Sequence, residues 1–193
     1  MSGHPEKIIF LTCDAYGVLP PVSKLNPSQA MYHFISGYTA KVAGTERGVT
    51  EPTATFSPCF GGPFLTLHPY EYARLLEKKM SEFKVPVYLV NTGWVGANAN
   101  SGANRISLPL TRKIIHAILD GSIERVNFKS DPYFGFSIPE SLKDIDPLIL
   151  NPQSSWSSEK EYTEAAISLV EKFQNNYSKY DTGDDAIRSG GPL

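Results

Sequence analysis

The residues best placed to do chemistry lie in one stretch of the chain, Tyr88 to Thr111, which reads YLVNTGWVGANANSGANRISLPLT. Asn91 and Trp94 come directly after a short apolar segment, Val87 to Val90, that suits a buried strand. Backbone amides and an indole face beyond the end of such a strand could hold a purine base or another planar ligand. The alternative is that Trp94 anchors the core and Asn91 forms a turn, and this window favours neither interpretation.

Arg105 and Thr111 could complete such a site. Arg105 follows the polar run ANANSGAN, and its planar guanidinium could lie against a base or clamp a phosphate. We expect a helix to begin at Thr111, which would then offer a hydroxyl and a free backbone amide. A surface arginine followed by an N-cap threonine is the simpler alternative.

Two further polar positions could face a ligand. Asp14 follows the strand-like segment Lys7 to Cys13, and ligands of open α/β sheets lie beyond the carboxyl ends of strands. It could equally accept hydrogen bonds from the turn that follows it. Arg47, in a glycine- and threonine-rich segment, could meet a phosphate or carboxylate, but an ion pair with Glu46 or Glu51 is at least as plausible.

Familiar catalytic motifs are missing from the sequence. It contains no GxxxxGK[ST] phosphate loop, no paired histidines at metal spacing, no GxSxG and no Cys/His pair with a local signature. Cys13 and Cys59 follow no metal spacing, and we expect two reduced, buried thiols. We expect a structural or surface role for His33. No residue of this chain is therefore a candidate catalytic group or metal ligand.

Composition excludes some classes of partner. The 193 residues suit one substantial domain, and 18 basic against 20 acidic residues give no field that would attract nucleic acid or an anionic membrane. The apolar runs fall far short of the roughly 20 residues that cross a bilayer. With a polar beginning, MSGHPEK, we expect neither a secretory leader nor a membrane span, and a cytoplasmic location.

The elements that would position the site predict an α/β fold, a mixed sheet with flanking helices. Lys7 to Cys13 and Val87 to Val90 are apolar on both faces and suit strands buried from both sides. Residues 43–63 and 122–157 look mostly irregular, with a strand-like segment at 133–138. Helices are expected to start near Asn26, His68, Thr111 and Ser158, with these apolar stripes: Met31, Phe34, Ile35, Tyr38 and Val42; Tyr72, Leu75, Leu76, Met80 and Phe83; Ile114, Ile115, Ile118 and Leu119; Tyr162, Ala166, Leu169, Phe173 and Tyr177.

Several long motifs occur in a fixed order: IIFLTCDAYGVLPPVSKL, YHFISGYTAKVAGTERGVTEPTATFSPCFGGPFLTLHP, YLVNTGWVG and NRISLPLTRKIIHAILDGS. Together they closely resemble the C-terminal part of ATP-dependent phosphoenolpyruvate carboxykinase, particularly the fungal type. The resemblance implies a mononucleotide-binding domain of that family over residues 1–193, with 158–193 as a helical tail. It runs over nearly the whole chain, so it is more specific than any single glycine pattern.

The resemblance also implies an activity and a binding segment. The family uses ATP to convert oxaloacetate to phosphoenolpyruvate, ADP and carbon dioxide in gluconeogenesis, with Mg²⁺ and Mn²⁺ at the site. Its RISxxxT segment lines the adenine and ribose pocket, and here this segment comprises Arg105, Ile106, Ser107, Leu108, Pro109, Leu110 and Thr111.

What the matched region lacks matters equally. The family's phosphate loop, its metal ligands and its oxaloacetate-binding residues lie upstream of the match, which covers only about the last third of the family's length. We therefore expect a fragment or a truncated gene product, inactive alone, whose partner is the missing N-terminal part. The alternative is a non-catalytic remnant that docks on a full-length enzyme without binding nucleotide.

Overall fold

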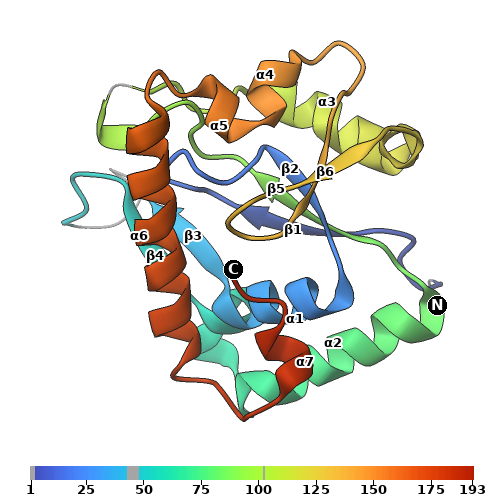
Figure 1. Ribbon diagram of the computed structural model, residues 1–193. Helices are drawn as coiled ribbons and strands as arrows, with labels where there is room; N and C mark the ends of the chain where they lie inside the picture. Colours follow the sequence, from blue (N-terminus) through green and yellow to red (C-terminus); the bar gives the residue numbers. More distant parts are fainter. Residues whose placement is uncertain (1–2, 43–47, 102) are drawn as a thin grey trace.

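A five-stranded mixed sheet forms the centre of the protein, whose computed structural model describes residues 3–42, 48–101 and 103–193 (Figure 1). The order across the sheet is β1-β5-β2-β7-β6, and a separate two-stranded sheet pairs β3 with β4. The predicted class, an α/β fold with a mixed sheet and flanking helices, is confirmed. The strands are β1 (Ile8–Thr12), β2 (Val22–Leu25), β3 (Tyr38–Lys41), β4 (Thr53–Phe56), β5 (Val87–Asn91), β6 (Phe128–Ser130) and β7 (Ser137–Pro139).

The pairing of β1 with β5 brings two distant segments to one edge of the sheet. These strands are parallel, with Ile8 opposite Val87 and Thr12 opposite Asn91. Their carboxyl ends therefore coincide, and the loop after β5 begins beside the turn after β1. β2 runs antiparallel on the other side of β5, so β5 lies between β1 and β2 and is paired on both edges.

Helices cover both faces of the sheet. Figure 1 shows α3 (Leu108–Leu119), α4 (Pro147–Leu150) and α5 (Pro152–Ser155) on one side, and α1 (Pro27–Ser36), α2 (Pro69–Phe83) and α7 (Asp185–Arg188) on the other. α6 (Glu159–Tyr177) runs along one end of the molecule. Short 3₁₀ turns occur at Pro58–Phe60, Gly62–Phe64, Ala99–Ser101 and Ser122–Arg125.

Alternate residues of β5 supply the two halves of the core. Leu89 packs in the cluster that contains residues of α1, α2 and α6, whereas Tyr88 and Val90 pack against Ile114 and Ile118 of α3. Side chains of a strand alternate between faces, so a strand covered on both sides is apolar at every position. This explains the uninterrupted apolar run from Val87 to Val90, which is followed by Asn91.

The predicted start of α1 is confirmed, but its predicted end is wrong. Asn26 accepts a hydrogen bond from the Gln29 amide, and the Gln29 side chain accepts one from the Asn26 amide, which is a complete capping box. The helix ends at Ser36 because Gly37 adopts a left-handed conformation, with φ 53° and ψ 42°. Tyr38, expected on the helix, instead begins β3, and Val42 lies beyond that strand.

Three other expectations need correction. β1 is an edge strand, and Leu11 is 58% exposed, so this strand is not buried from both sides. Leu75 and Leu119, expected inside, are 57% and 62% exposed, because the contact faces of α2 and α3 are narrower than their apolar stripes. The strand expected at 133–138 is shorter and displaced: β7 begins only at Ser137.

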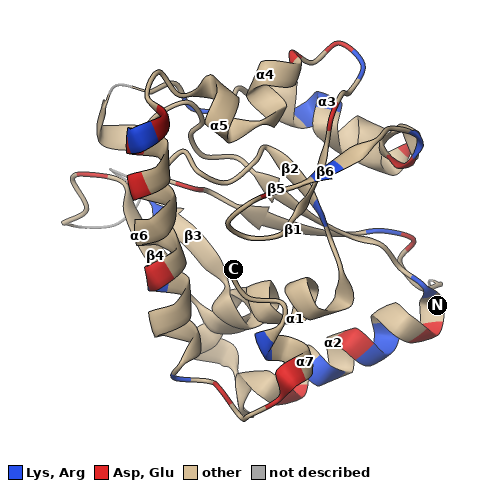
Figure 2. Ribbon diagram, viewed as in Figure 1, with Lys and Arg blue, Asp and Glu red and all other residues tan. Residues whose placement is uncertain are grey.

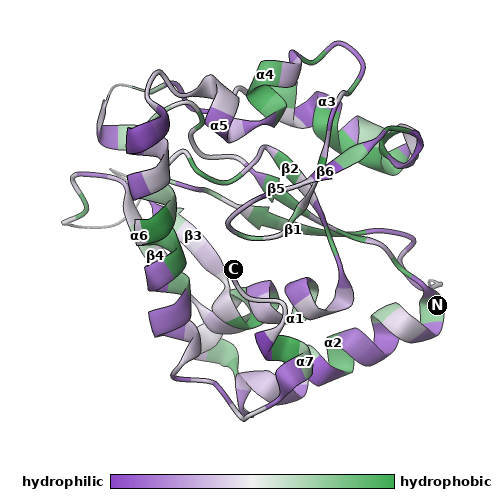
Figure 3. Ribbon diagram, in the orientation of Figure 1, coloured by the Kyte–Doolittle hydropathy of each residue, from purple (hydrophilic) through white to green (hydrophobic). Residues whose placement is uncertain are grey.

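α6 follows its predicted pattern. The Ser158 side chain caps the helix by accepting a hydrogen bond from the Glu161 amide. The five residues of the predicted stripe are all buried: Tyr162, Ala166, Leu169, Phe173 and Tyr177. Figure 2 shows that charges gather on the helices and loops, and Figure 3 shows hydrophobic colour concentrated on β1, β2 and β5. Within the described ranges, no helix is long and apolar enough to cross a bilayer.

Candidate nucleotide site

Asn91, at the end of β5, fastens the turn after β1 to the loop after β5. Its side chain is fully buried, and its Oδ1 accepts hydrogen bonds from the amides of Asp14 (2.9 Å) and Gly93 (2.8 Å). Its Nδ2 donates to the carbonyl of Leu19 (2.9 Å). An asparagine with both ends of its amide engaged holds the loop in place, and it is not available to a ligand.

The backbone amides of this loop are also engaged, which corrects our expectation that they point at a ligand. The amide of Thr92 donates to Thr12 O (2.8 Å), and that of Trp94 donates to Asp14 O (2.9 Å). The amide of Asn91 itself donates to Pro21 O (3.0 Å). The parallel pairing of β1 and β5 continues into the loop, so donors that would be free at an isolated strand end are satisfied within the chain.

Asp14 has the structural role that was one of its two predicted alternatives. It is fully buried and accepts hydrogen bonds from the amides of Tyr16, Val18 and Leu19 and from the Tyr38 hydroxyl. Burial raises the pKa of this carboxyl, and the four donors oppose that shift. Its acceptor capacity is used within the protein, so Asp14 shapes the turn beneath the site and does not face solvent.

Arg105 is exposed at the end of this loop, and several groups of the chain hold its side chain. Its Nε donates to the Thr92 carbonyl (2.8 Å), and its Nη2 lies 3.7 Å from Cys13 Sγ. The guanidinium carbon lies 5.5 Å from the centre of the Trp94 ring, a cation–π distance. The indole is only 9% exposed, so Trp94 serves as the core anchor and supports the exposed Arg105 side chain.

The start of α3 lies three residues earlier than expected. Ser107 caps the helix by accepting a hydrogen bond from the Leu110 amide, and Leu108 is the first helical residue. The Thr111 amide and hydroxyl therefore both donate to the Ser107 carbonyl, at 3.0 and 3.2 Å, and neither is free. Pro109 in the first turn favours this earlier start, because proline is suited to the beginning of a helix.

The backbone around Arg105 is tied to the loop after β5. Trp94 and Arg105 form an antiparallel bridge, and the Ile106 amide donates to Gly93 O (2.7 Å). Ile106 is 7% exposed, whereas Arg105, Ser107 and Leu108 are exposed. The segment thus turns Ile106 inward and presents exposed side chains on both sides of it, and these do not enclose a pocket.

The other predicted positions lie outside this cluster or are structural. Cys13 is a buried free thiol whose pKa is raised by burial, and Cys59 is a half-buried free thiol, so the expected burial holds fully only for Cys13. His33 is buried among aromatic rings. Arg47 and Glu46 lie outside the described residues. In the part of the chain that is described, no three His, Cys, Asp or Glu side chains come together as a site for a metal ion.

Comparison with known proteins decides the family. A family model described as Phosphoenolpyruvate carboxykinase, of the ATP type, matches residues 1–147. The chain belongs to this family. It is 56% identical over 182 residues to the phosphoenolpyruvate carboxykinase (ATP) of Leptospira biflexa, with 94% of this chain and 34% of that protein covered. The matched region includes β1, β5 and the Arg105–Thr111 segment.

Two other carboxykinases show the same coverage. The phosphoenolpyruvate carboxykinase (ATP) of Methylobacterium radiotolerans is 48% identical over 99% of this chain and 35% of its own length. That of Campylobacter jejuni is 52% identical over 96% of this chain and 35% of its own length. The chain thus spans about a third of the relatives' length, which is consistent with a C-terminal portion, while the fungal type stays a prediction.

The sequence alone did not reveal the groups that hold Arg105. Thr92 acts through its carbonyl oxygen, which no side-chain pattern reveals. Cys13 lies 92 positions away from Arg105, and only the parallel pairing of β1 with β5 brings the two together. The serine–proline pair at 107 and 109 was a visible signal for the correct start of α3.

Proposed function

We propose that this chain supplies the adenine and ribose side of the ATP site of a phosphoenolpyruvate carboxykinase. The segment assigned to that role is Arg105 to Thr111, with Ile106, Ser107, Leu108, Pro109 and Leu110 between them. The observation that carries the proposal is the exposed guanidinium of Arg105, which is oriented by Thr92 and Trp94. An arginine fixed in this way offers a flat cationic face and spare donors to a nucleotide.

The proposal gives Arg105 a binding role without chemistry at the reacting atoms. Phosphoryl transfer depends on groups that cradle the phosphates and stabilise the charge that moves. The resemblance assigns those groups, the Mg²⁺ and Mn²⁺ ligands and the oxaloacetate contacts to a region outside this match. We therefore propose that the chain alone does not turn over oxaloacetate, and that its partner is the remaining part of such an enzyme, acting in gluconeogenesis in the cytoplasm.

The open edge of the sheet supports the need for that partner. β1 pairs with β5 on one side, and its other edge forms no strand pairing with any described residue. Leu11, the fourth of the five residues of this edge strand, is 58% exposed. An unpaired edge with an exposed leucine is a natural place for a further strand to add.

The experiment is a two-part assay of phosphoenolpyruvate formation from oxaloacetate and ATP. The first part uses the isolated chain, for which we expect no product above background. The second adds the part of the Leptospira biflexa relative that this chain does not cover, produced in the same cells, and we expect ATP-dependent turnover. Product formation by the isolated chain would overturn the proposed inactivity.

A non-catalytic docking module remains the second candidate function. The engagement of the loop amides within the chain favours it, because it removes donors that a nucleotide would otherwise use. The two candidates differ in one respect: a docking module associates with the remaining part of the enzyme but shows no heat of ATP binding in calorimetry.

A further inference from the structure

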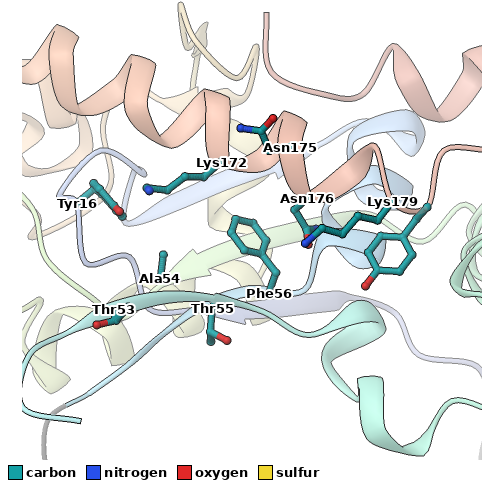
Figure 4. A pocket seen from close by; sticks show the side chains of 10 residues that line it. Tyr16, Thr53, Ala54, Thr55, Phe56, Lys172, Asn175, Asn176 and Lys179 are labelled. Carbon is teal, nitrogen blue, oxygen red and sulfur yellow. The ribbon is translucent and has the colours of Figure 1, made fainter.

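A second candidate binding site lies between β4 and the carboxyl-terminal half of α6, and it shares no lining residue with the Arg105–Thr111 segment. The cavity has a volume of about 520 Å³ and opens to solvent. Tyr16, Phe56 and Tyr180 give it aromatic sides, and Lys172, Asn176 and Lys179 give it polar donors (Figure 4). No aspartate or glutamate is among the residues that line it.

Asn176 is the feature that a purely structural explanation does not account for. Its side chain is only 6% exposed, and its Nδ2 is buried without a hydrogen-bond partner among the described residues. Figure 4 shows this side chain pointing from α6 toward β4, whereas the neighbouring Asn175 points away. Buried N–H donors are nearly always paired, so an unpaired one on a side chain that lines a cavity points to an acceptor bound there.

The two lysines give the cavity its charge. Neither Lys172 nor Lys179 forms an ion pair with a described carboxylate, in contrast to Lys160 near the start of the same helix, which pairs with Glu164. The Lys172 ammonium lies 5.8 Å from the centre of the Tyr16 ring, at the margin of the cavity. Cations near a helix carboxyl terminus also offset the helix dipole, which explains their charge but leaves the Asn176 amide unpaired.

We propose that this cavity binds a small oxyanion group, a phosphate or a carboxylate, with Asn176 as the neutral donor and Lys172 and Lys179 as the cationic donors. The Asn176 amide nitrogen and the two ammonium groups are donors, and the ionised oxygens of phosphate and carboxylate accept hydrogen bonds. The aromatic sides suit a ligand in which the anion is attached to an organic body. The inference goes beyond the proposed nucleotide function, since a ligand could bind here whether or not Arg105 holds adenine.

The test is an NMR titration of the ¹⁵N-labelled chain at constant ionic strength, first with inorganic phosphate and then with acetate. We expect saturable shifts of the Asn176 side-chain amide signals, which Asn176→Ser identifies by removing them. Binding of phosphate alone would identify a phosphate site, and binding of acetate as well would show that a carboxylate also fits.

Matched lysine variants show whether the binding uses this cavity. The double variant Lys172→Gln/Lys179→Gln should weaken binding by about tenfold or more, because charge-assisted hydrogen bonds are lost. Lys160→Gln, on the same helix but away from the cavity, should bind as the original chain does. The absence of saturable shifts with both anions, or equal affinity in the double variant and the original chain, would refute the proposal. Thermal unfolding of each variant confirms that it is folded.

Discussion

At the scale of single residues, the candidate nucleotide site depends on which hydrogen-bond donors and acceptors already have partners within the chain. Asn91 and Asp14 were each either a ligand contact or a turn residue on the sequence alone, and both are fully buried and hydrogen-bonded within the chain. Arg105 is different because its partners, the Thr92 carbonyl and the Trp94 ring, orient the guanidinium and leave part of it exposed. A polar residue in a suitable motif is therefore a candidate ligand contact only if its hydrogen-bonding groups are not already used within the chain.

His33 gives a residue-scale prediction about pH. It lies 4.8 Å from the Phe136 ring and 5.1 Å from the Phe173 ring, and burial lowers its pKa from 6.5 to about 3. The unfolded chain binds a proton at this histidine below pH 6.5 and the folded chain does not. The free energy of unfolding contributed by this residue therefore falls as pH drops from about 6.5 toward 3.

Urea unfolding at pH 7.5 and pH 5 measures this effect. Relative to a His33→Leu variant, the original chain should lose about 2 kcal/mol more of its unfolding free energy between the two values. Asp14 and Asp131, whose pKa values are raised by burial, act in the opposite direction, but they are present in both proteins. Equal losses in the two proteins would show that His33 is protonated in the folded state.

At the scale of elements, the candidate nucleotide site forms where the loop after β1 and the loop after β5 pack against each other. A Cβ atom placed on Gly93 would lie 2.2 Å from the Asp14 carbonyl oxygen and 2.4 Å from its nitrogen. Both are backbone atoms held by the parallel pairing and by Asn91, so neither can move away cheaply. This position requires glycine because of the close approach of two chain segments.

Gly93→Ala should accordingly cost roughly 3 kcal/mol or more of unfolding free energy, as overpacking against a fixed backbone does. Gly3→Ala is the control, because a Cβ there meets nothing within 4 Å. Chemical denaturation of both variants gives the comparison. A Gly93→Ala protein as stable as the Gly3→Ala protein would show that the two loops leave room for a Cβ atom at position 93.

The elements also show how far the sequence alone could reach. Caps with a local chemical signature were predictable: Asn26 with Gln29, and Ser158. β3 and β4 were missed because each has four residues and no apolar run, and their pairing depends on contacts between strands. In the candidate site, the motif assigns a binding role to Arg105, and that role stays a prediction. The satisfied amides of the loop could not be predicted, because they depend on the register of β1 against β5, which is a long-range property.

At the scale of the whole molecule, the sheet ends on one side at β1, an apolar strand whose outer edge pairs with no described residue. Leu11 is 58% exposed in the edge strand, so it contributes little to the stability of this chain by itself. The chain spans about a third of its relatives' length, and this edge is where we expect the remaining part to add.

Leu11→Lys tests that expectation in the two-part assay. The free energy of unfolding of the isolated variant should differ from that of the original chain by no more than about 0.5 kcal/mol, as for other exposed positions. Turnover with the complementary part of the relative should fall strongly, because a charge at an edge opposes strand addition. Lys78→Gln, on the exposed side of α2, is the control and should leave turnover unchanged. Full turnover with Leu11→Lys would place the contact elsewhere.

The central claim is that the chain itself holds the adenine end of ATP through Arg105. Calorimetric titration of the isolated chain with ATP and with adenosine measures this most directly. We expect weak, saturable binding, with an affinity for adenosine close to the affinity for ATP. Arg105→Ala should weaken it at least about tenfold, and Arg74→Ala on α2 should leave it unchanged. Unaltered affinity in Arg105→Ala, or no binding by the folded chain, would contradict the account.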